Sequence, residues 1–278
     1  SNFGDQSDRP LKKRDGTWAY IMPDIAYHAD KIARGFEILI NVLGADHSGY
    51  LERMRPAVAA LGDNKAQIDV IFNQMVKILK NGEPVKLSKR SGNIITLREM
   101  VEEVGAGAIR FFMLTRSPDS QLEFDYAKVI EQSADNPVFY VQYAHARCAS
   151  VLRHAAELFP DFDVSKADLS HLKDPAEIAM MKQLALWPRV VEQAATAREP
   201  HKIAFYLMEV AAAFHSLWNK GRENAHLRFL VSEDQAGSLA RLALVAATKT
   251  TIASALGVMG VKPVEEMKSD ALKDEEAA

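Results

Sequence analysis

The pattern of apolar and polar positions divides the chain into two regions of different character. Up to about residue 125, short apolar runs alternate with helical periodicities, which predicts a mixture of strands and helices. After residue 125, apolar residues recur at helical spacing over four long segments: 126–159, 175–198, 200–224 and 234–259. Four long amphipathic helices with short connections are typical of a bundle. We therefore predict an α/β region over 1–125 and an all-α region over 126–278.

Turn and capping residues predict the elements of the first region. Asn81-Gly82 is the strongest hairpin signal in the chain and predicts strands on either side, over 67–80 and 83–87. Thr96 and Glu99 have capping-box spacing and predict a helix, interrupted at two glycines, that runs to about Arg116. The other predicted elements are a hairpin over 9–22 that turns at Asp15-Gly16, a helix over 23–34 and a buried parallel strand over 37–43.

Composition narrows the class of protein. With 278 residues, 48% of them hydrophobic and 26% charged, the chain can bury a sizeable core, which excludes a disordered chain. The single Cys148 excludes a disulfide framework and a zinc site built from several cysteines. The chain has no uninterrupted apolar run of about 18 residues and its first residues are polar, so we predict no membrane span, no signal peptide and a cytoplasmic location.

Net charge does not decide whether the chain binds nucleic acid. The formal charge is −3 at pH 7. Six acidic residues and two lysines follow residue 262, so the acidic excess is concentrated in the C-terminal tail. The rest of the chain is close to neutral, which argues for neither an acidic nor a basic partner.

The first candidate for chemistry is the basic segment after the predicted Asn81-Gly82 hairpin. Its residues are Lys86, Leu87, Ser88, Lys89 and Arg90. Two lysines three residues apart, with Ser and Gly nearby, suit a loop that closes on a polyphosphate and stabilises the charge on departing pyrophosphate. A solvated basic turn explains the same residues, and the segment is not a Walker loop.

Two further candidates precede that segment. Asp46-His47 follows the predicted parallel strand, and ligands of open α/β sheets bind beyond the carboxyl ends of strands. Asp24 and Tyr27 share a helix face, with Tyr20 just before the helix, and a carboxylate beside phenols suits a cationic substrate. A surface histidine and a hydrogen-bonded helix start are the alternatives.

Taken in order, these motifs resemble a known family. Tyr20-Ile-Met-Pro-Asp24-Ile-Ala-Tyr27-His28, then Gly44-Ala-Asp-His47-Ser-Gly-Tyr50, then Lys86-Leu-Ser-Lys89-Arg resemble the second half of the catalytic domain of bacterial arginyl-tRNA synthetases. The last motif is similar to the KMSKS signature of class I synthetases, with Leu87 and Arg90 as departures. The His-x-Gly-His signature of that class does not occur in the sequence. The resemblance therefore implies the C-terminal portion of such an enzyme.

The resemblance implies a fold and a set of roles for the first region. The expected fold is a partial Rossmann-like catalytic domain over 1–125, followed by an anticodon-binding bundle over 126–278. Tyr20 and Asp24 would contact arginine, with Asp24 pairing with the guanidinium, and Tyr27 and His47 would line the same pocket. Lys86 and Lys89 would act on the pyrophosphate of ATP. The implied cofactors are ATP and the Mg²⁺ that accompanies it, with no protein-bound zinc.

The second region carries residues that the resemblance assigns to the tRNA anticodon. These are Tyr140, Tyr143, Arg147, Phe214, Trp218 and Met267. Tyr140, Tyr143 and Arg147 share one helix face, and proteins bind unstacked bases on aromatic rings beside basic groups. An aromatic stripe at helical spacing is also the pattern of a helix core, and the sequence leaves both interpretations open.

Two functions follow as hypotheses. The first is part of an arginine–tRNA ligase, which activates arginine with ATP and transfers it to tRNA(Arg), as a monomer. The second is a catalytically incomplete tRNA-binding module. On either hypothesis we expect the chain alone to be inactive in aminoacylation. A cysteine-specific synthetase is disfavoured, because its zinc-bound thiolates have no counterpart in a chain with a single cysteine.

Overall fold

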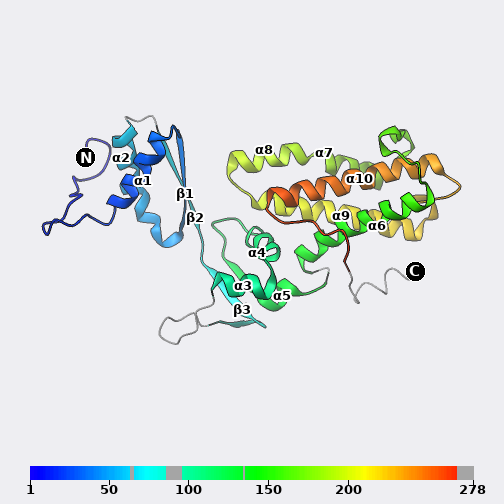
Figure 1. Ribbon diagram of the computed structural model, residues 1–278, viewed down its shortest axis with the longest axis horizontal. Helices are drawn as coiled ribbons and strands as arrows, with labels where there is room; N and C mark the ends of the chain where they lie inside the picture. The colour runs from blue at the N-terminus through cyan, green and yellow to red at the C-terminus, as the bar shows by residue number, and fades with distance from the viewer. Residues whose placement is uncertain (63–65, 86–95, 134, 268–278) are drawn as a thin grey trace. The chain divides into compact units, whose positions relative to one another are not determined.

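A computed structural model describes all residues except 63–65, 86–95, 134 and 268–278. The chain forms two compact units, drawn in Figure 1. The first unit is Ser1–Val76 with Pro118–Leu122, and the second is Lys77–Ser117 with Glu123–Ala278. The predicted domain boundary at residues 125/126 falls inside the second unit, where the strand that ends at Asp125 meets the helix that begins at Tyr126. As a domain boundary it stays a prediction.

The first unit is built on a pair of parallel strands. Its elements in chain order are α1 (Met22–Ala33), β1 (Ile38–Gly44), the 3-10 helix η1 (Ala45–Tyr50), α2 (Leu51–Gly62) and β2 (Gln67–Asn73). Strands β1 and β2 pair in parallel, with Ile38 opposite Gln67 and Gly44 opposite Asn73. The helix predicted over 23–34 and the parallel strand predicted over 37–43 are confirmed within one residue.

Burial of strand β1 is one-sided. Leu39 of β1 packs with Met54, Val58 and Ile68 in the core that helix α2 and strand β2 complete. Alternate residues of β1, among them Val42, are exposed. The prediction of a buried strand is therefore wrong for one of its two faces, because the described part of this unit covers only the face that carries Leu39.

Turn chemistry fixes two of the loops. Asn81 and Gly82 have φ angles of 56° and 80°, and they join β3 (Val76–Lys80) to β4 (Glu83–Pro84) as the sequence predicts. The hairpin predicted over 9–22 is reduced in the described structure to a turn at Gly16, closed by a single bridge between Lys12 and Trp18. The strand predicted over 67–80 is divided between β2 and β3, which belong to different sheets.

A small sheet and three short helices precede the bundle. The sheet has the strand order β4-β3-β5, with β5 at Leu122–Asp125. Thr96 and Glu99 form the predicted capping box at the start of α3 (Leu97–Val104). Gly105, at φ 84°, separates α3 from α4 (Ala106–Met113), and α5 covers Tyr126–Ile130. The positive φ explains why the chain cannot continue a single helix through residue 105.

The bundle contains the long helices of the molecule, and α6, α9 and α10 lie side by side in Figure 1. Its helices are α6 (Pro137–Leu158), α7 (Pro175–Ala185), α8 (Trp187–Ala197), α9 (His201–Glu223) and α10 (Gln235–Val258). Its 3-10 turns are η2 (Val164–Lys166), η3 (Leu169–His171) and η4 (Ala225–Leu227). The helix predicted over 175–198 is two helices, because a break at Leu186 precedes Pro188, whose nitrogen cannot donate. The helix predicted over 126–159 likewise divides at the Asn136 cap into α5 and α6.

Helix α10 is more apolar than α6 and α9, the other two long helices of the bundle. Among the described residues it is the one helix that meets the length and composition of a membrane span, with a mean hydropathy of 1.3 over 18 residues. Half of those residues are buried, and α10 packs against α6, α7 and α9. A central bundle helix meets the same criteria, and this packing accounts for the composition of α10.

Candidate functional site

Three oxygen-bearing side chains of the first unit share one surface. Asp24 lies in the first turn of α1, Tyr50 ends η1, and Tyr20, which is 85% exposed, precedes α1. Burial raises the pKa of Tyr50, and a hydrogen bond to Asp24, the charge of that carboxylate and the proximity of Tyr20 raise it further. The structure thus places Tyr20 and Asp24 both near Tyr50. No role for Tyr50 was predicted from the sequence, although its place at the end of the motif Gly44-Ala-Asp-His47-Ser-Gly-Tyr50 was an available signal.

A buried histidine holds this group against the strand. His28 Nδ1 donates to the carbonyl of Asp24 at 2.6 Å, and His28 Nε2 accepts from Asn41 Nδ2 at 2.9 Å. Lys31 Nζ donates to Asn41 Oδ1 at 3.2 Å, which fixes the orientation of the Asn41 amide. The histidine is therefore neutral with its proton on Nδ1. It joins α1 to β1 and fixes the backbone on which Asp24 is carried.

The two remaining residues predicted for this pocket have other described partners. Tyr27 is exposed, and the Lys31 ammonium lies 4.4 Å from the centre of its ring. His47 is exposed within η1, and its Nδ1 lies 3.0 Å from Asp46 Oδ1. A Cβ at Gly44 would meet that same Asp46 oxygen at 2.8 Å, so glycine allows the Asp46 side chain to fold back over the strand end. The roles proposed for Tyr27 and His47 in a pocket stay predictions.

The basic segment predicted to bind a polyphosphate falls outside the described residues. Its members are Lys86, Leu87, Ser88, Lys89 and Arg90. The described chain ends before them at Val85, one residue after β4, and the roles of the two lysines stay predictions.

In the bundle, the aromatic residues predicted to contact RNA gather around one arginine. The guanidinium carbon of Arg147 lies 4.1 Å from the centre of the Tyr143 ring and 4.7 Å from that of Trp218. Arg147 Nη1 donates to His215 Nδ1 at 3.3 Å, and His215 Nε2 donates to the Tyr140 carbonyl at 3.3 Å. The cluster joins α6 to α9 through cation–π contacts and a neutral histidine.

The members of this cluster differ in their access to solvent. Tyr143 and Arg147 are buried, and Phe214, which is 1% exposed, stacks on Phe229 with the ring planes 4° apart. Tyr140 and Trp218 are half-buried. The geometry therefore follows the core interpretation for the first three residues and leaves Tyr140 and Trp218 able to meet a ligand as they stand. Contact of these residues with an anticodon stays a prediction.

Met267 ends a segment that we call the C-terminal strap, residues 261–267. Gln142 of α6 binds the strap as a second backbone would, donating to the Lys262 carbonyl at 2.9 Å and accepting from the Val264 amide at 3.0 Å. His145 Nδ1 donates to the Val264 carbonyl at 2.8 Å, and Glu265 pairs with Lys249 of α10 at 2.7 Å. The strap is thus fixed to the bundle, with Met267 half-buried at its end.

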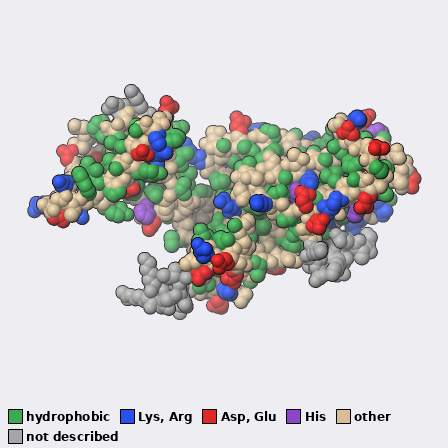
Figure 2. Space-filling view, viewed as in Figure 1, with side chains coloured by type: hydrophobic (Ala, Val, Ile, Leu, Met, Phe, Trp, Pro, Cys, Tyr) green, Lys and Arg blue, Asp and Glu red, His purple; other side chains and the backbone are tan. Residues whose placement is uncertain are grey.

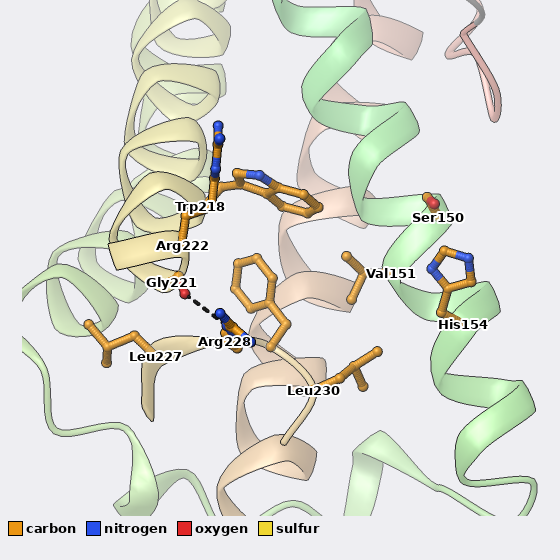
Figure 3. Close-up of a pocket in the computed structure, with 10 residues that line it drawn as sticks. Ser150, Val151, His154, Trp218, Gly221, Arg222, Leu227, Arg228 and Leu230 are labelled. Carbon is orange, nitrogen blue, oxygen red and sulfur yellow. Dashed lines mark hydrogen bonds between the residues drawn. The ribbon is translucent and has the colours of Figure 1, made fainter. Parts of the chain in front are cut away.

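A cavity of about 630 Å³ opens beside Trp218 (Figure 3). It is bounded by α9, by the second half of α6 and by the segment from η4 to Leu230. The lining residues are Ser150, Val151, His154, Trp218, Gly221, Arg222, Leu227, Arg228, Phe229 and Leu230. On the face that Figure 2 shows, acidic and basic side chains are interspersed over the bundle. Among the ten lining residues there are two arginines and a histidine and no acidic side chain.

The chain is similar in sequence to a known domain family and to known enzymes. Residues 141–267 match the DALR anticodon binding domain, and this range contains the cavity and five of the six residues predicted for the anticodon. The arginine–tRNA ligase of Rhodospirillum rubrum is 59% identical over 274 residues, and that of Parvibaculum lavamentivorans is 55% identical over 272. The chain is homologous to part of the bacterial arginine–tRNA ligases. The predicted resemblance to the C-terminal part of that family is confirmed.

The matches cover nearly all of this chain but only about half of each relative. Each of the two relatives matches 96% of this chain, which in turn spans 46% and 47% of their lengths, about half. The crystal structure of a putative arginyl-tRNA synthetase from Campylobacter jejuni superposes on this chain with a TM-score of 0.82, and the two sequences are 34% identical. The match covers 96% of this chain and 56% of the Campylobacter chain. The Thermus thermophilus arginyl-tRNA synthetase shares the fold, with a TM-score of 0.73 and 24% sequence identity. The match covers 92% of this chain and 50% of the Thermus chain.

Proposed function

We propose that this chain supplies the arginine pocket and the tRNA anticodon-binding bundle of an arginine–tRNA ligase. The whole enzyme would activate arginine with ATP and transfer the arginyl group to tRNA(Arg). The observation that carries the proposal is the 59% identity to an arginine–tRNA ligase across 96% of the chain, together with the DALR match inside the bundle. Because the relatives are about twice as long, we propose that activation of arginine requires the part of their length that this chain does not span.

For the first unit we propose a pocket that recognises the guanidinium of arginine. The Asp24 carboxylate offers two oxygens that a guanidinium can engage in a bidentate pair. Its proximity to Tyr50, which raises the pKa of that phenol, and the nearby exposed Tyr20 support this assignment. Tyr27 and His47 would contribute to the rim. We further propose that the β1–β2 pair and helices α1 and α2 belong to a larger Rossmann-like sheet.

For the ATP chemistry we propose that Lys86 and Lys89 stabilise departing pyrophosphate, as in the motif that they resemble. Mg²⁺ would arrive on ATP and neutralise phosphate charge. Among the described residues, the structure holds no group of three His, Cys, Asp or Glu side chains that could bind a metal ion. No protein-bound zinc is part of this proposal.

For the bundle we propose contact with the anticodon of tRNA(Arg) through Tyr140, Trp218 and Met267, with the buried Tyr143, Arg147 and Phe214 as the residues that hold this surface in place. The test is a titration of the purified chain, at fixed salt, with tRNA(Arg) and with the same tRNA carrying a changed middle anticodon base. We expect binding at least tenfold weaker to the changed tRNA, which corresponds to about 1.4 kcal/mol. Equal binding to both would contradict anticodon recognition.

A second function is favoured by the partial coverage of the relatives. A chain that spans 46% of an arginine–tRNA ligase can act as a tRNA-binding module without aminoacylation activity of its own. Arginine-dependent exchange of pyrophosphate into ATP separates the two functions. We expect no exchange by the chain alone, and robust exchange would show that it holds a complete activation site. We also propose a cytoplasmic location and a monomeric state.

A further inference from the structure

We propose that His28 is a positioning residue for arginine recognition, and that it makes the Asp24 carboxylate selective for a planar guanidinium over an ammonium. This inference rests on the proposed function, in which Asp24 binds the side chain of arginine. His28 is 2% exposed and lies one helical turn after Asp24 on α1. Its two ring nitrogens contact the backbone of Asp24 and strand β1, so His28 acts on the ligand only through Asp24.

The hydrogen bonds around His28 run in one direction. An ammonium group can only donate, so the contact of Lys31 Nζ with Asn41 at 3.2 Å requires the amide oxygen of Asn41 on that side. The amide nitrogen of Asn41 then faces His28 Nε2 at 2.9 Å, and this ring nitrogen must accept. The ring proton is thereby left on Nδ1, which donates to the Asp24 carbonyl at 2.6 Å. Lys31 thus determines, through Asn41, which nitrogen of His28 holds the backbone of Asp24.

Asp24 needs such an anchor because it lies in the first turn of α1. The N-cap residue of this helix is Ile21, whose side chain cannot accept from the first amides. Uncapped first turns open more readily than the middle of a helix. His28 joins this turn to Asn41 of β1, and the neighbouring Leu39 of the same strand is 2% exposed in the core of the unit. The first turn of α1 is therefore held by a strand that is itself fixed.

Selectivity follows from the fixed orientation of the carboxylate. A guanidinium is planar and presents its N–H groups as a rigid fork, so a bidentate pair needs both carboxylate oxygens at one angle. An ammonium is a compact charge with three rotatable donors, and it pairs with a carboxylate from many directions. A shift of the turn that carries Asp24 therefore costs arginine one of its two hydrogen bonds but costs lysine little. A supported carboxylate favours arginine over lysine, although the two side chains carry the same charge.

The first test needs no ligand. Nitrogen NMR of the isotope-labelled chain distinguishes a protonated ring nitrogen of histidine from an unprotonated one. We expect the His28 proton on Nδ1, with Nε2 unprotonated, because Asn41 donates to Nε2. A proton on Nε2 would overturn the inference, since His28 could then not donate to the Asp24 carbonyl. This measurement leaves the proposed function untouched, whatever its result.

The second test exchanges the ring for side chains that keep one of its two contacts. Asparagine places its amide nitrogen near the position of Nδ1 and can still donate to the Asp24 carbonyl, whereas glutamine places its amide near Nε2 and reaches Asn41 instead. The Kd values for arginine and for lysine are measured by NMR titration of the whole chain. We expect His28→Gln to bind arginine about fivefold more weakly, the factor typical of one hydrogen bond, with lysine changed less than about twofold. We expect His28→Asn to bind arginine within about twofold of the wild type.

Val58→Ala is the control for stability alone. Val58 lies on α2, is 1% exposed and packs in the core with Leu39, so its truncation destabilises the same unit. We expect the ratio of the arginine and lysine Kd values to stay as in the wild type. Circular dichroism confirms that each variant is folded. If His28→Gln does not fold, Asn41→Leu takes its place, because it removes the partner of Nε2, and we expect the same selective loss of arginine binding.

The outcomes separate this inference from the proposed function. If the wild type binds arginine and His28→Gln weakens arginine and lysine equally, or no more than Val58→Ala does, the positioning role is overturned and the proposed function stands. A His28→Asn variant as weak as His28→Gln also overturns the inference, because the contact with the Asp24 carbonyl would then not matter. If the wild type does not bind arginine, the proposed pocket fails, and the role of His28 fails with it.

Discussion

The two units use aromatic side chains in opposite ways. In the first unit, Tyr20 stands 85% exposed next to Asp24, where it packs little and can meet a ligand. In the bundle, Phe214 is 1% exposed and Tyr143 is 6% exposed, so both rings hold helices together. The sequence motifs assign ligand contacts to aromatic residues in both units. A sequence motif thus identifies a location in the fold, and burial then determines which side chain at that location can bind a ligand.

The sharpest test of this contrast is truncation of one ring from each unit. Phe214→Ala removes a fully buried ring and leaves a cavity, so we expect the free energy of unfolding to fall by about 3–5 kcal/mol. Tyr20→Ala removes an exposed ring, and we expect a change within about 0.5 kcal/mol. Urea unfolding followed by circular dichroism measures both values. Equal losses of unfolding free energy would contradict the difference in packing between the two rings.

A second prediction concerns the junction between the small sheet and the bundle. The buried Asp125 carboxylate accepts from the amides of Asn81, Gly82 and Ala127, at 3.1, 2.7 and 3.0 Å, and so fixes the hairpin to the start of α5. We expect Asp125→Ala to lower the free energy of unfolding by about 1–3 kcal/mol and to speed hydrogen exchange at the two hairpin amides.

The matched control for Asp125 lies two residues earlier on the same strand. Glu123 is exposed and pairs with Lys77 at 3.2 Å, so Glu123→Ala should cost less than about 1 kcal/mol. A Glu123 variant as destabilised as the Asp125 variant would mean that the strand itself, and not the carboxylate contacts, holds the junction.

The third prediction is a pH dependence in the bundle. Burial, followed by the charge of Glu209, raises the pKa of Tyr206 from 10.0 to about 12, and its hydroxyl donates to the Gln183 carbonyl at 3.0 Å. A raised pKa in the folded state contributes stability that is complete below pH 10 and is lost as the pH rises towards about 12. We expect Tyr206→Phe to be less stable at neutral pH and to lose less stability over that interval. Parallel declines in the two proteins would disprove the assignment.

The smallest expected effect lies in the first unit. Asp24→Asn removes the carboxylate charge that helps to raise the pKa of Tyr50, so the phenol of Tyr50 should ionise at lower pH. Phenolate absorbance during alkaline titration measures the change. Asp30→Asn, on the same helix in an exposed pair with Arg34, serves as the control and should leave the Tyr50 titration unchanged. An equal shift of the Tyr50 titration in both variants would contradict the proximity of Asp24 to Tyr50.

Local rules accounted for much of the fold. Asn81-Gly82 predicted its hairpin because both residues tolerate positive φ, and Thr96 with Glu99 predicted its helix start because each side chain satisfies a backbone amide. The break at Leu186 was missed, since proline is also favoured in the first turn of a helix and periodicity continues across it.

The candidate sites were less accessible from sequence. Helical spacing placed Tyr140, Tyr143 and Arg147 on one helix face, but could not say that this face meets Trp218 or that Arg147 lies between the rings. The roles of Asp125 and Gln142 depend on partners 44 and 120 residues away, and no local pattern reports such a contact. Long-range polar contacts such as these could therefore not be predicted from the sequence.

The separation of 120 positions between Gln142 and Lys262 also sets an order of events during synthesis. Helix α6 emerges from the ribosome well before α10 and the strap exist, and at about 5–20 residues per second the delay is roughly 6–24 s. Until then, the face of α6 that will be buried is in water. That face includes the polar side chains Gln142, His145 and Arg147, which stay hydrated until their partners on the strap and on α9 have been made. These polar groups therefore gain their hydrogen bonds late, and the last of them only when synthesis reaches the strap.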